Sequence, residues 1–272
     1  MQELKDTQSE ADTRNISIDR VGVKGLRFPI QIQDKLNRIQ STVATVSLAV
    51  DLPEEFKGTH MSRFVEALHQ HGPLLDVHTA LAIPRELLRR LSARRSHVEM
   101  EFPFFRSKNA PVTGIEGLMD YVVRFEMEAE ANNKLADFKL TVIVPVTTLC
   151  PCSKAISDEG AHSQRSSVRI QAKFKGFLWL EDLIEIAERS GSSPVYTLLK
   201  REDEKFVTES AFAHPAFVED VVRSAAKGAQ QFGDVPGVEQ VVGDMADVDA
   251  FAAALQGCDT VFHCAAFFRD NY

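Results

Sequence analysis

One short segment, residues 147–167, holds the side chains best suited to chemistry. It reads TTLCPCSKAISDEGAHSQRSS, so Cys150 and Cys152 are one residue apart and His162 follows twelve residues after Cys150. A thiolate and an imidazole are typical ligands of zinc and similar divalent ions. A catalytic metal site uses three protein ligands and keeps one position open for water, whose pKa the metal lowers. We therefore expect a metal site here, with a third ligand, a carboxylate, from elsewhere in the chain.

Less specific interpretations fit the same residues. The Cys-X-Cys pair could be a redox pair or two small buried residues, and His162 could be a solvated loop histidine. A structural zinc site would more usually fill all four positions with Cys and His. The spacing alone does not decide between a catalytic metal site and the other interpretations.

A second segment, residues 198–220, is rich in carboxylates and reads LLKREDEKFVTESAFAHPAFVED. We expect most of these acidic side chains to be solvated, and those near a helix start also suit the helix dipole. Glu219 follows Phe217 and Val218, so its side chain could face inward. An inward carboxylate can accept two parallel hydrogen bonds from the ring N–H and the amino group of guanine. The acidic residues of the segment include Glu202, Asp203, Glu204, Glu209, Glu219 and Asp220.

The composition excludes several classes of protein. The chain has 272 residues, 44% of them hydrophobic, and a formal net charge of −8, which disfavours a general nucleic-acid binder. No apolar run approaches the roughly 20 residues of a membrane helix, and residues 1–14 resemble a mobile polar arm, not a signal peptide. Four cysteines without a secretory leader do not indicate a disulfide framework. We expect a cytoplasmic enzyme with a basic pocket for any anionic substrate.

The elements that must position these residues alternate between strands and helices. Period-two alternation predicts half-buried antiparallel strands around residues 46–50, 123–130 and 168–175, and residues 140–146 form a further β-rich run. Helical spacing occurs at residues 61–68 with Thr59 as the cap, at 84–93, at 180–189 and at 216–226 after Pro215. The order predicts an α+β architecture in two similar halves that divide near Phe105, each an antiparallel sheet with helices on one face.

The motifs together resemble the prokaryotic type IB GTP cyclohydrolase family. The matching stretches are LCPCSKAISDEGAHSQRS, KREDEKFVTESAF, HPAFVEDVVR and KGTHMSRFVEAL, in family order and spacing across roughly residues 16–226. The resemblance implies a tunnelling fold with two tandem modules per chain and a homotetramer with active sites at subunit interfaces. It implies conversion of GTP to 7,8-dihydroneopterin triphosphate and formate, which begins folate and related pterin biosynthesis, with zinc, manganese or iron.

The resemblance also implies roles for individual residues. Cys150, His162 and Glu204 would be the metal ligands. Cys152 would lie beside the metal and move protons, and Glu219 in FVED would anchor the purine. From their charge, the basic residues expected to contact the triphosphate are Lys154, Arg165, Lys200 and Arg201.

The end of the chain departs from the family pattern. Residues 15–229 form the cyclohydrolase-like part, whereas residues 230–272 resemble a βαβ fragment of an extended short-chain dehydrogenase or sugar-nucleotide epimerase. This tail lacks a glycine-rich phosphate loop and a Tyr-X-X-X-Lys pair, so it cannot bind a dinucleotide. The family's terminal histidine pair is missing, and His263 is no substitute because a parallel-type apolar strand is expected around it. We expect an exposed sheet edge and impaired turnover.

Two alternatives stay open. A catalytically inactive protein that binds metal or purine would carry the same motifs. Another tunnelling-fold enzyme acting on a pterin or deazapurine would also use a cysteine and a glutamate, although the long CPC-to-GAH spacing argues against it. A nicotinamide oxidoreductase is suggested only by the tail, and the missing phosphate loop argues against it.

Overall fold

The computed structural model describes residue 8, residues 10–36, 38–132, 137–173 and 178–230, and the backbone of 261–268. Contacts divide the chain into two compact units. One comprises residues 1–103 and 124–139, and the other comprises residues 104–123 and 140–272. A single cut near Phe105 therefore does not separate them, because the chain returns residues 124–139 to the first unit.

The first unit is built on long antiparallel strands. Strand β1 (Ile18–Gln33) pairs antiparallel with β2 (Ile39–Leu52), and β2 pairs antiparallel with β4 (Arg95–Asn109). The short β3 (Leu74–Leu75) pairs parallel with β1. The alternation predicted for residues 46–50 is confirmed, because every second residue between Ala44 and Val50 is buried. Those residues are Ala44, Val46, Leu48 and Val50.

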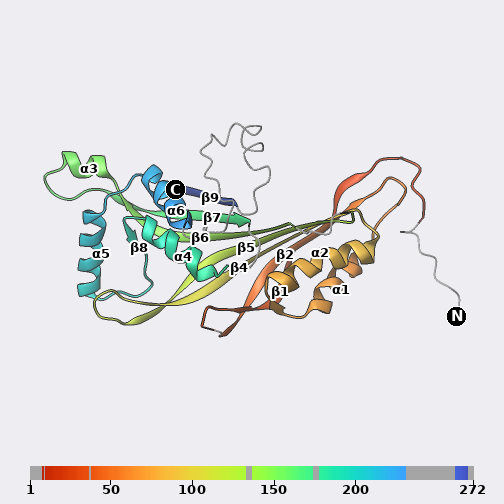
Figure 1. Ribbon diagram of the computed structural model, residues 1–272, viewed down its shortest axis with the longest axis horizontal. Helices are drawn as coiled ribbons and strands as arrows, with labels where there is room; N and C mark the ends of the chain where they lie inside the picture. The colour runs from red at the N-terminus through yellow and green to blue at the C-terminus, as the bar shows by residue number, and fades with distance from the viewer. Residues whose placement is uncertain are drawn as a thin grey trace. The chain divides into compact units, whose positions relative to one another are not determined.

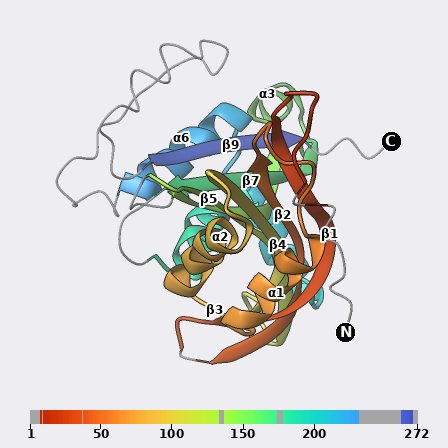
Figure 2. The same ribbon diagram turned by 90° about the vertical axis from the view of Figure 1, so that its right-hand side faces the viewer.

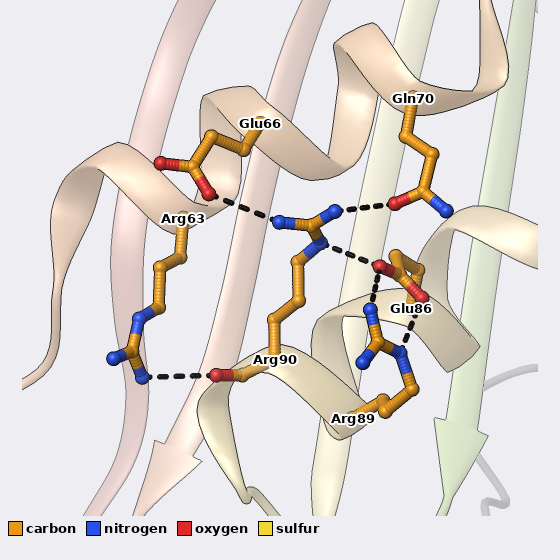
Figure 3. Close-up of polar contacts among 6 residues, drawn as sticks. All are labelled: Arg63, Glu66, Gln70, Glu86, Arg89 and Arg90. Carbon is orange, nitrogen blue, oxygen red and sulfur yellow. Dashed lines mark hydrogen bonds and ion pairs between the residues drawn. The ribbon is translucent and has the colours of Figure 1, made fainter.

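Two helices, α1 (Met61–His71) and α2 (Val77–Leu91), lie side by side against the β1–β2 sheet in this unit (Figures 1 and 2). Arg90 joins them on their outer side (Figure 3): its guanidinium donates to Glu86 at 2.5 Å, to Glu66 at 3.0 Å and to Gln70. Arg89 also pairs with Glu86, and these hydrogen bonds to two guanidinium groups lower the pKa of Glu86 to about 2 despite opposing desolvation.

The starts of both helices differ from the prediction. The residue before α1 is His60, without a side-chain cap, so Thr59 does not cap this helix. Helix α2 begins at Val77 and not at Pro84, which lies inside it. The cause is a capping box, in which Asp76 accepts from the Thr79 N–H at 2.7 Å and Thr79 Oγ1 accepts from the Asp76 N–H at 2.8 Å. The helix therefore starts seven residues before the predicted start at Pro84.

The second unit contains the remaining strands. Strand β5 (Glu116–Glu130) contributes residues to both units and is followed in the sheet by β6 (Asp137–Leu149), β7 (Ser163–Lys173) and β9 (Val261–Phe268). The two-residue β8 (Ser193–Pro194) pairs antiparallel with β6. The predicted strands in β5, β6 and β7 are confirmed.

Helices in the second unit partly match the prediction. Helix α4 (Leu180–Ser190) is followed by Gly191 as predicted, and it packs on α6 (Val218–Ala229) and β7. Helix α6 begins at Val218, two residues later than expected. Helix α5 (Arg201–Ala213) was not predicted, because it buries only Asp203 and Ala211 and therefore lacks an apolar stripe. The short α3 (Pro151–Ile156) was also missed.

Strand β9 corrects the expectation for the end of the chain. It pairs antiparallel with β7 over eight registered positions, from Val261 opposite Lys173 to Phe268 opposite Ser166. The β7 edge is therefore covered along these residues, and the strand is not of the parallel type expected around His263. The rest of the tail, residues 231–260 and 269–272, lies outside the described residues. Its expected resemblance to a dehydrogenase remains a prediction.

The architecture is mixed α+β, a large sheet backed by helices, as predicted. Helices α1 and α2 lie against β1 and β2, and α4 and α6 lie against β7 (Figures 1 and 2). Among the helices in the described part of the chain, none combines the length and apolar character needed to cross a membrane.

Candidate active site

Cys150 lies where the chain leaves the sheet. Strand β6 ends at Leu149, whose N–H donates to the buried Ser192 Oγ at 3.0 Å. Cys150 is the N-cap of α3, and Pro151 occupies the first helical position, where its missing N–H costs nothing. The Cys150 Sγ accepts the N–H of Ser153 at 3.4 Å. A rigid strand and a short helix therefore fix a half-buried thiol at the sheet end.

The loop after α3 returns His162 to Cys150. Gly160 has φ of +78°, a left-handed conformation that favours glycine, and it reverses the chain. The Cys150 N–H then donates to the His162 carbonyl at 3.1 Å, and the His162 N–H donates to Ser153 Oγ at 3.1 Å. The twelve-residue spacing is thus a closed loop that holds both predicted ligands at one place. The His162 side chain is exposed.

Glu204 is on the first turn of α5 and is exposed. Its neighbour Asp203 is completely buried and accepts four hydrogen bonds from the peptide N–H groups of Val112, Thr113 and Lys200 and from Thr113 Oγ1, all at 2.7–3.0 Å. Burial raises the pKa of Asp203, but these hydrogen bonds outweigh it and hold the pKa well below the ordinary value. Asp203 therefore fixes the helix start from which Glu204 projects.

The start of α6 is tied to the residue before Cys150, since the Ala216 N–H donates to the Leu149 carbonyl at 3.1 Å. Glu219 lies in the first turn of α6 and is exposed, not inward as expected. The buried face of α6 is formed by Val221, Ala225 and Ala229, and Glu219 falls on the other side. Its neighbour Asp220 accepts the Phe217 N–H at 3.1 Å, which fixes this turn.

The other predicted site residues are on the same unit. Cys152 is exposed on the first turn of α3. Lys154 Nζ donates to the Phe212 carbonyl at 2.5 Å and lies 4.2 Å from the centre of the Phe212 ring, so it links α3 to the end of α5. Of the four basic residues predicted to contact the triphosphate, three are exposed: Arg165 on β7, and Lys200 and Arg201 at the start of α5.

The structure brings Cys150 and His162 together but does not assemble a complete metal site. Within the residues that it describes, no three His, Cys, Asp or Glu side chains are close enough together to hold a metal ion.

Sequence reasoning missed Ser153 and Asp203. The signal for Asp203 was a carboxylate three residues after the N-cap position, where it can accept the N–H of the residue that precedes the helix, here Lys200.

The same unit contains a second polar cluster, formed by Lys108, Tyr121 and Glu188. Glu188 Oε1 accepts from Lys108 Nζ at 2.6 Å and from the Tyr121 hydroxyl at 2.7 Å, and Lys108 also donates to the Val195 carbonyl at 2.8 Å. Burial lowers the pKa of Lys108, which Glu188 opposes, and burial beside Glu188 raises the pKa of Tyr121. The side chains of this cluster pair with one another and with the backbone, so we interpret it as structural.

Comparison with known proteins gives consistent matches. The family described as Type I GTP cyclohydrolase folE2 matches residues 4–242. GTP cyclohydrolase FolE2 of Akkermansia muciniphila is 82% identical over 231 residues, covering 85% of this chain and 88% of the relative. GTP cyclohydrolase FolE2 of Maridesulfovibrio salexigens is 49% identical over 255 residues, covering 94% of this chain and 96% of the relative. A structure of uricase from Arthrobacter globiformis covers 93% of this chain and 94% of the uricase chain, with a TM-score of 0.46 and 7% sequence identity. This similarity is weak.

Proposed function

Because this chain belongs to the type I GTP cyclohydrolase FolE2 family, we propose that it converts GTP to 7,8-dihydroneopterin triphosphate and formate. This reaction begins the biosynthesis of folate and related pterins. The observation that carries the proposal is the family match over residues 4–242, which includes Cys150, His162, Glu204 and Glu219. A water molecule is consumed overall as C8 of guanine leaves as formate.

A divalent metal, zinc, manganese or iron, would be held by Cys150, His162 and Glu204. The first two residues fit such an ion, because their donor atoms are suitable and their backbones are joined by a 3.1 Å hydrogen bond. The assignment of Glu204 as the third ligand rests on the family motif. Its carboxylate is exposed on α5, so the side chain can change its rotamer. When bound, an ion of this kind activates water for attack near neutral pH.

The remaining residues would bind and orient the substrate. Glu219 would accept the N1–H and the 2-amino group of guanine, a bidentate arrangement that distinguishes guanine from adenine. Its exposure on a single chain leaves it accessible to the purine. The Cys152 thiol would move a proton between substrate and solvent. The triphosphate would be held by Arg165, Lys200 and Arg201, and Lys154 would join them by exchanging its contact with Phe212.

We further propose a tunnelling fold with two tandem modules and a cytoplasmic homotetramer whose active sites lie at subunit interfaces. The support is that the proposed ligands His162 and Glu204 and the proposed anchor Glu219 are exposed in the single chain. Exposed site residues are what an interface that completes each site would require. Sedimentation velocity of the full chain tests the assembly, and a monomer that is active at all concentrations would refute it.

The tail is the basis for a second candidate, a catalytically inactive protein that binds metal and purine. The family match ends at residue 242, inside the segment that the sequence predicts to be foreign. Loss of a proton-carrying histidine typically costs about 100- to 10,000-fold in rate. In this candidate, turnover of GTP would be at least about 100-fold slower than in an enzyme that has such a histidine.

The experiment incubates the purified full chain with GTP and zinc, manganese or iron(II), and measures formate together with the fluorescent pterin formed on oxidation. The matched variants are Cys150→Ala, His162→Ala and Glu219→Gln. We expect metal binding to fall in the first two and the KM for GTP to rise in the third. Metal content unchanged in both ligand variants would refute the proposed site. Metal and GTP binding without product would favour the inactive candidate.

A further inference from the structure

Ser153 contacts both residues that are proposed to begin the metal site. Its peptide N–H donates to Cys150 Sγ at 3.4 Å, and its Oγ accepts the peptide N–H of His162 at 3.1 Å. The first contact favours one orientation of the thiol side chain. The second holds the backbone of a residue whose imidazole is otherwise exposed.

These contacts complete a two-point attachment of His162. The carbonyl of His162 is held by the Cys150 N–H at 3.1 Å, and its N–H is held by Ser153 Oγ. Residues 157–160 of the intervening loop are exposed, so little else in that part of the loop packs against the protein. The position of the imidazole relative to the thiol therefore depends strongly on the segment from Cys150 to Ser153.

We propose that Ser153 is a positioning residue for the metal centre. It holds the Cys150 thiol and the His162 backbone in fixed positions relative to each other before a metal binds. This inference rests on the proposed function, because it assumes that both residues are ligands. Groups that orient metal ligands through hydrogen bonds typically change metal affinity by about 10- to 100-fold when they are removed. Ser153 does not itself bind metal or substrate in this proposal.

The test compares three variants of the full chain. Ser153→Ala removes the acceptor for His162, and Ser153→Thr keeps a hydroxyl at the same place. Ser157→Ala is the matched control: the Ser157 hydroxyl donates to the Glu159 carbonyl at 2.9 Å in the same loop and contacts neither ligand. Zinc affinity is measured by competition with a chelating dye. The cobalt-substituted protein is measured by its thiolate charge-transfer absorption, which reports the ligand geometry.

We expect zinc affinity to fall about 10- to 100-fold in Ser153→Ala with a changed cobalt spectrum, and to stay near the wild-type value in Ser153→Thr and Ser157→Ala. In the metal-free protein, the His162 amide should exchange faster with solvent in Ser153→Ala. This second measurement does not depend on metal or activity. Thermal unfolding of each variant shows whether it is folded.

Two results would overturn the inference alone: wild-type zinc affinity and cobalt spectrum in Ser153→Ala, or an unchanged exchange rate at His162. A wild-type chain that binds neither zinc nor cobalt would instead overturn the proposed metal centre, and this inference with it. The wild-type measurement therefore separates failure of the positioning role from failure of the proposed function.

Discussion

Removal of the Glu188 carboxylate should destabilise the second unit more than any loss of a surface charge. In Glu188→Ala, the Lys108 ammonium would keep only the Val195 carbonyl of the two acceptors it now has. The Tyr121 hydroxyl would lose the oxygen to which it donates at 2.7 Å. Lys108 and Glu188 have side-chain exposures of 13% and 10%, so water replaces the missing partner poorly.

The expected magnitude follows from these contacts. Breaking a buried ion pair by removing one partner costs about 3–5 kcal/mol. The remaining contact of Lys108 to the Val195 carbonyl places the value near the lower end, at about 3 kcal/mol. That loss corresponds to a decrease in Tm of about 6–12 °C for a chain of this size class. Tyr121→Phe removes a single hydrogen bond and should cost about 1 kcal/mol.

The assay is urea and thermal unfolding at one fixed protein concentration, with Glu185→Ala as the matched control. Glu185 is on the same helix and pairs with Arg189, whose side chain is 77% exposed, so the loss of this pair should cost less than about 1 kcal/mol. The double variant Lys108→Met with Glu188→Leu should recover most of the stability. Equal losses in Glu188→Ala and Glu185→Ala would refute the reasoning.

Three further predictions concern other parts of the chain. The pKa of Glu86 is about 2 in the folded protein and 4.5 ordinarily, so the ionised carboxylate stabilises the fold above pH 4.5 and this contribution is lost as the pH falls towards 2. In acid unfolding, the free energy of unfolding of Glu86→Gln should therefore change less with pH in that window than that of the wild type. In Asp203→Asn, the side-chain NH2 group would face at least one of the N–H groups that now donate to the carboxylate. The backbone amide hydrogens of Val112, Thr113 and Lys200 should therefore exchange faster with solvent, and unchanged exchange would contradict the anchoring role of Asp203. Gly160→Ala has free space for a methyl group but needs a positive φ, so it should cost about 1 kcal/mol in thermal unfolding; a neutral result would argue against the left-handed turn.

Strands could be predicted from the sequence because one face of each is buried. The alternation of Val46, Leu48 and Val50 with polar or small residues follows directly from that burial. Helix α4 was equally clear, since it packs an apolar face on α6 and β7. Helix α5 could not be found in the same way, because an almost entirely exposed helix leaves no apolar period in the sequence.

The candidate site shows the same limit. The types and spacing of Cys150 and His162 predict a shared location, and a closed loop between them provides it. The roles of Ser153 and Asp203 depend on hydrogen bonds to peptide groups, which residue types alone do not reveal. The pairing of β9 with β7 was also unpredictable, since the direction of a strand depends on its partner and not on its own sequence.

The most direct test of the proposed function is product formation by the purified full chain. Incubated with GTP and a divalent metal, the protein should release formate and the oxidisable pterin in equal amounts, and neither product should form after His162→Ala. The absence of both products from the folded, metal-loaded wild-type chain would contradict the proposal that it is an active cyclohydrolase.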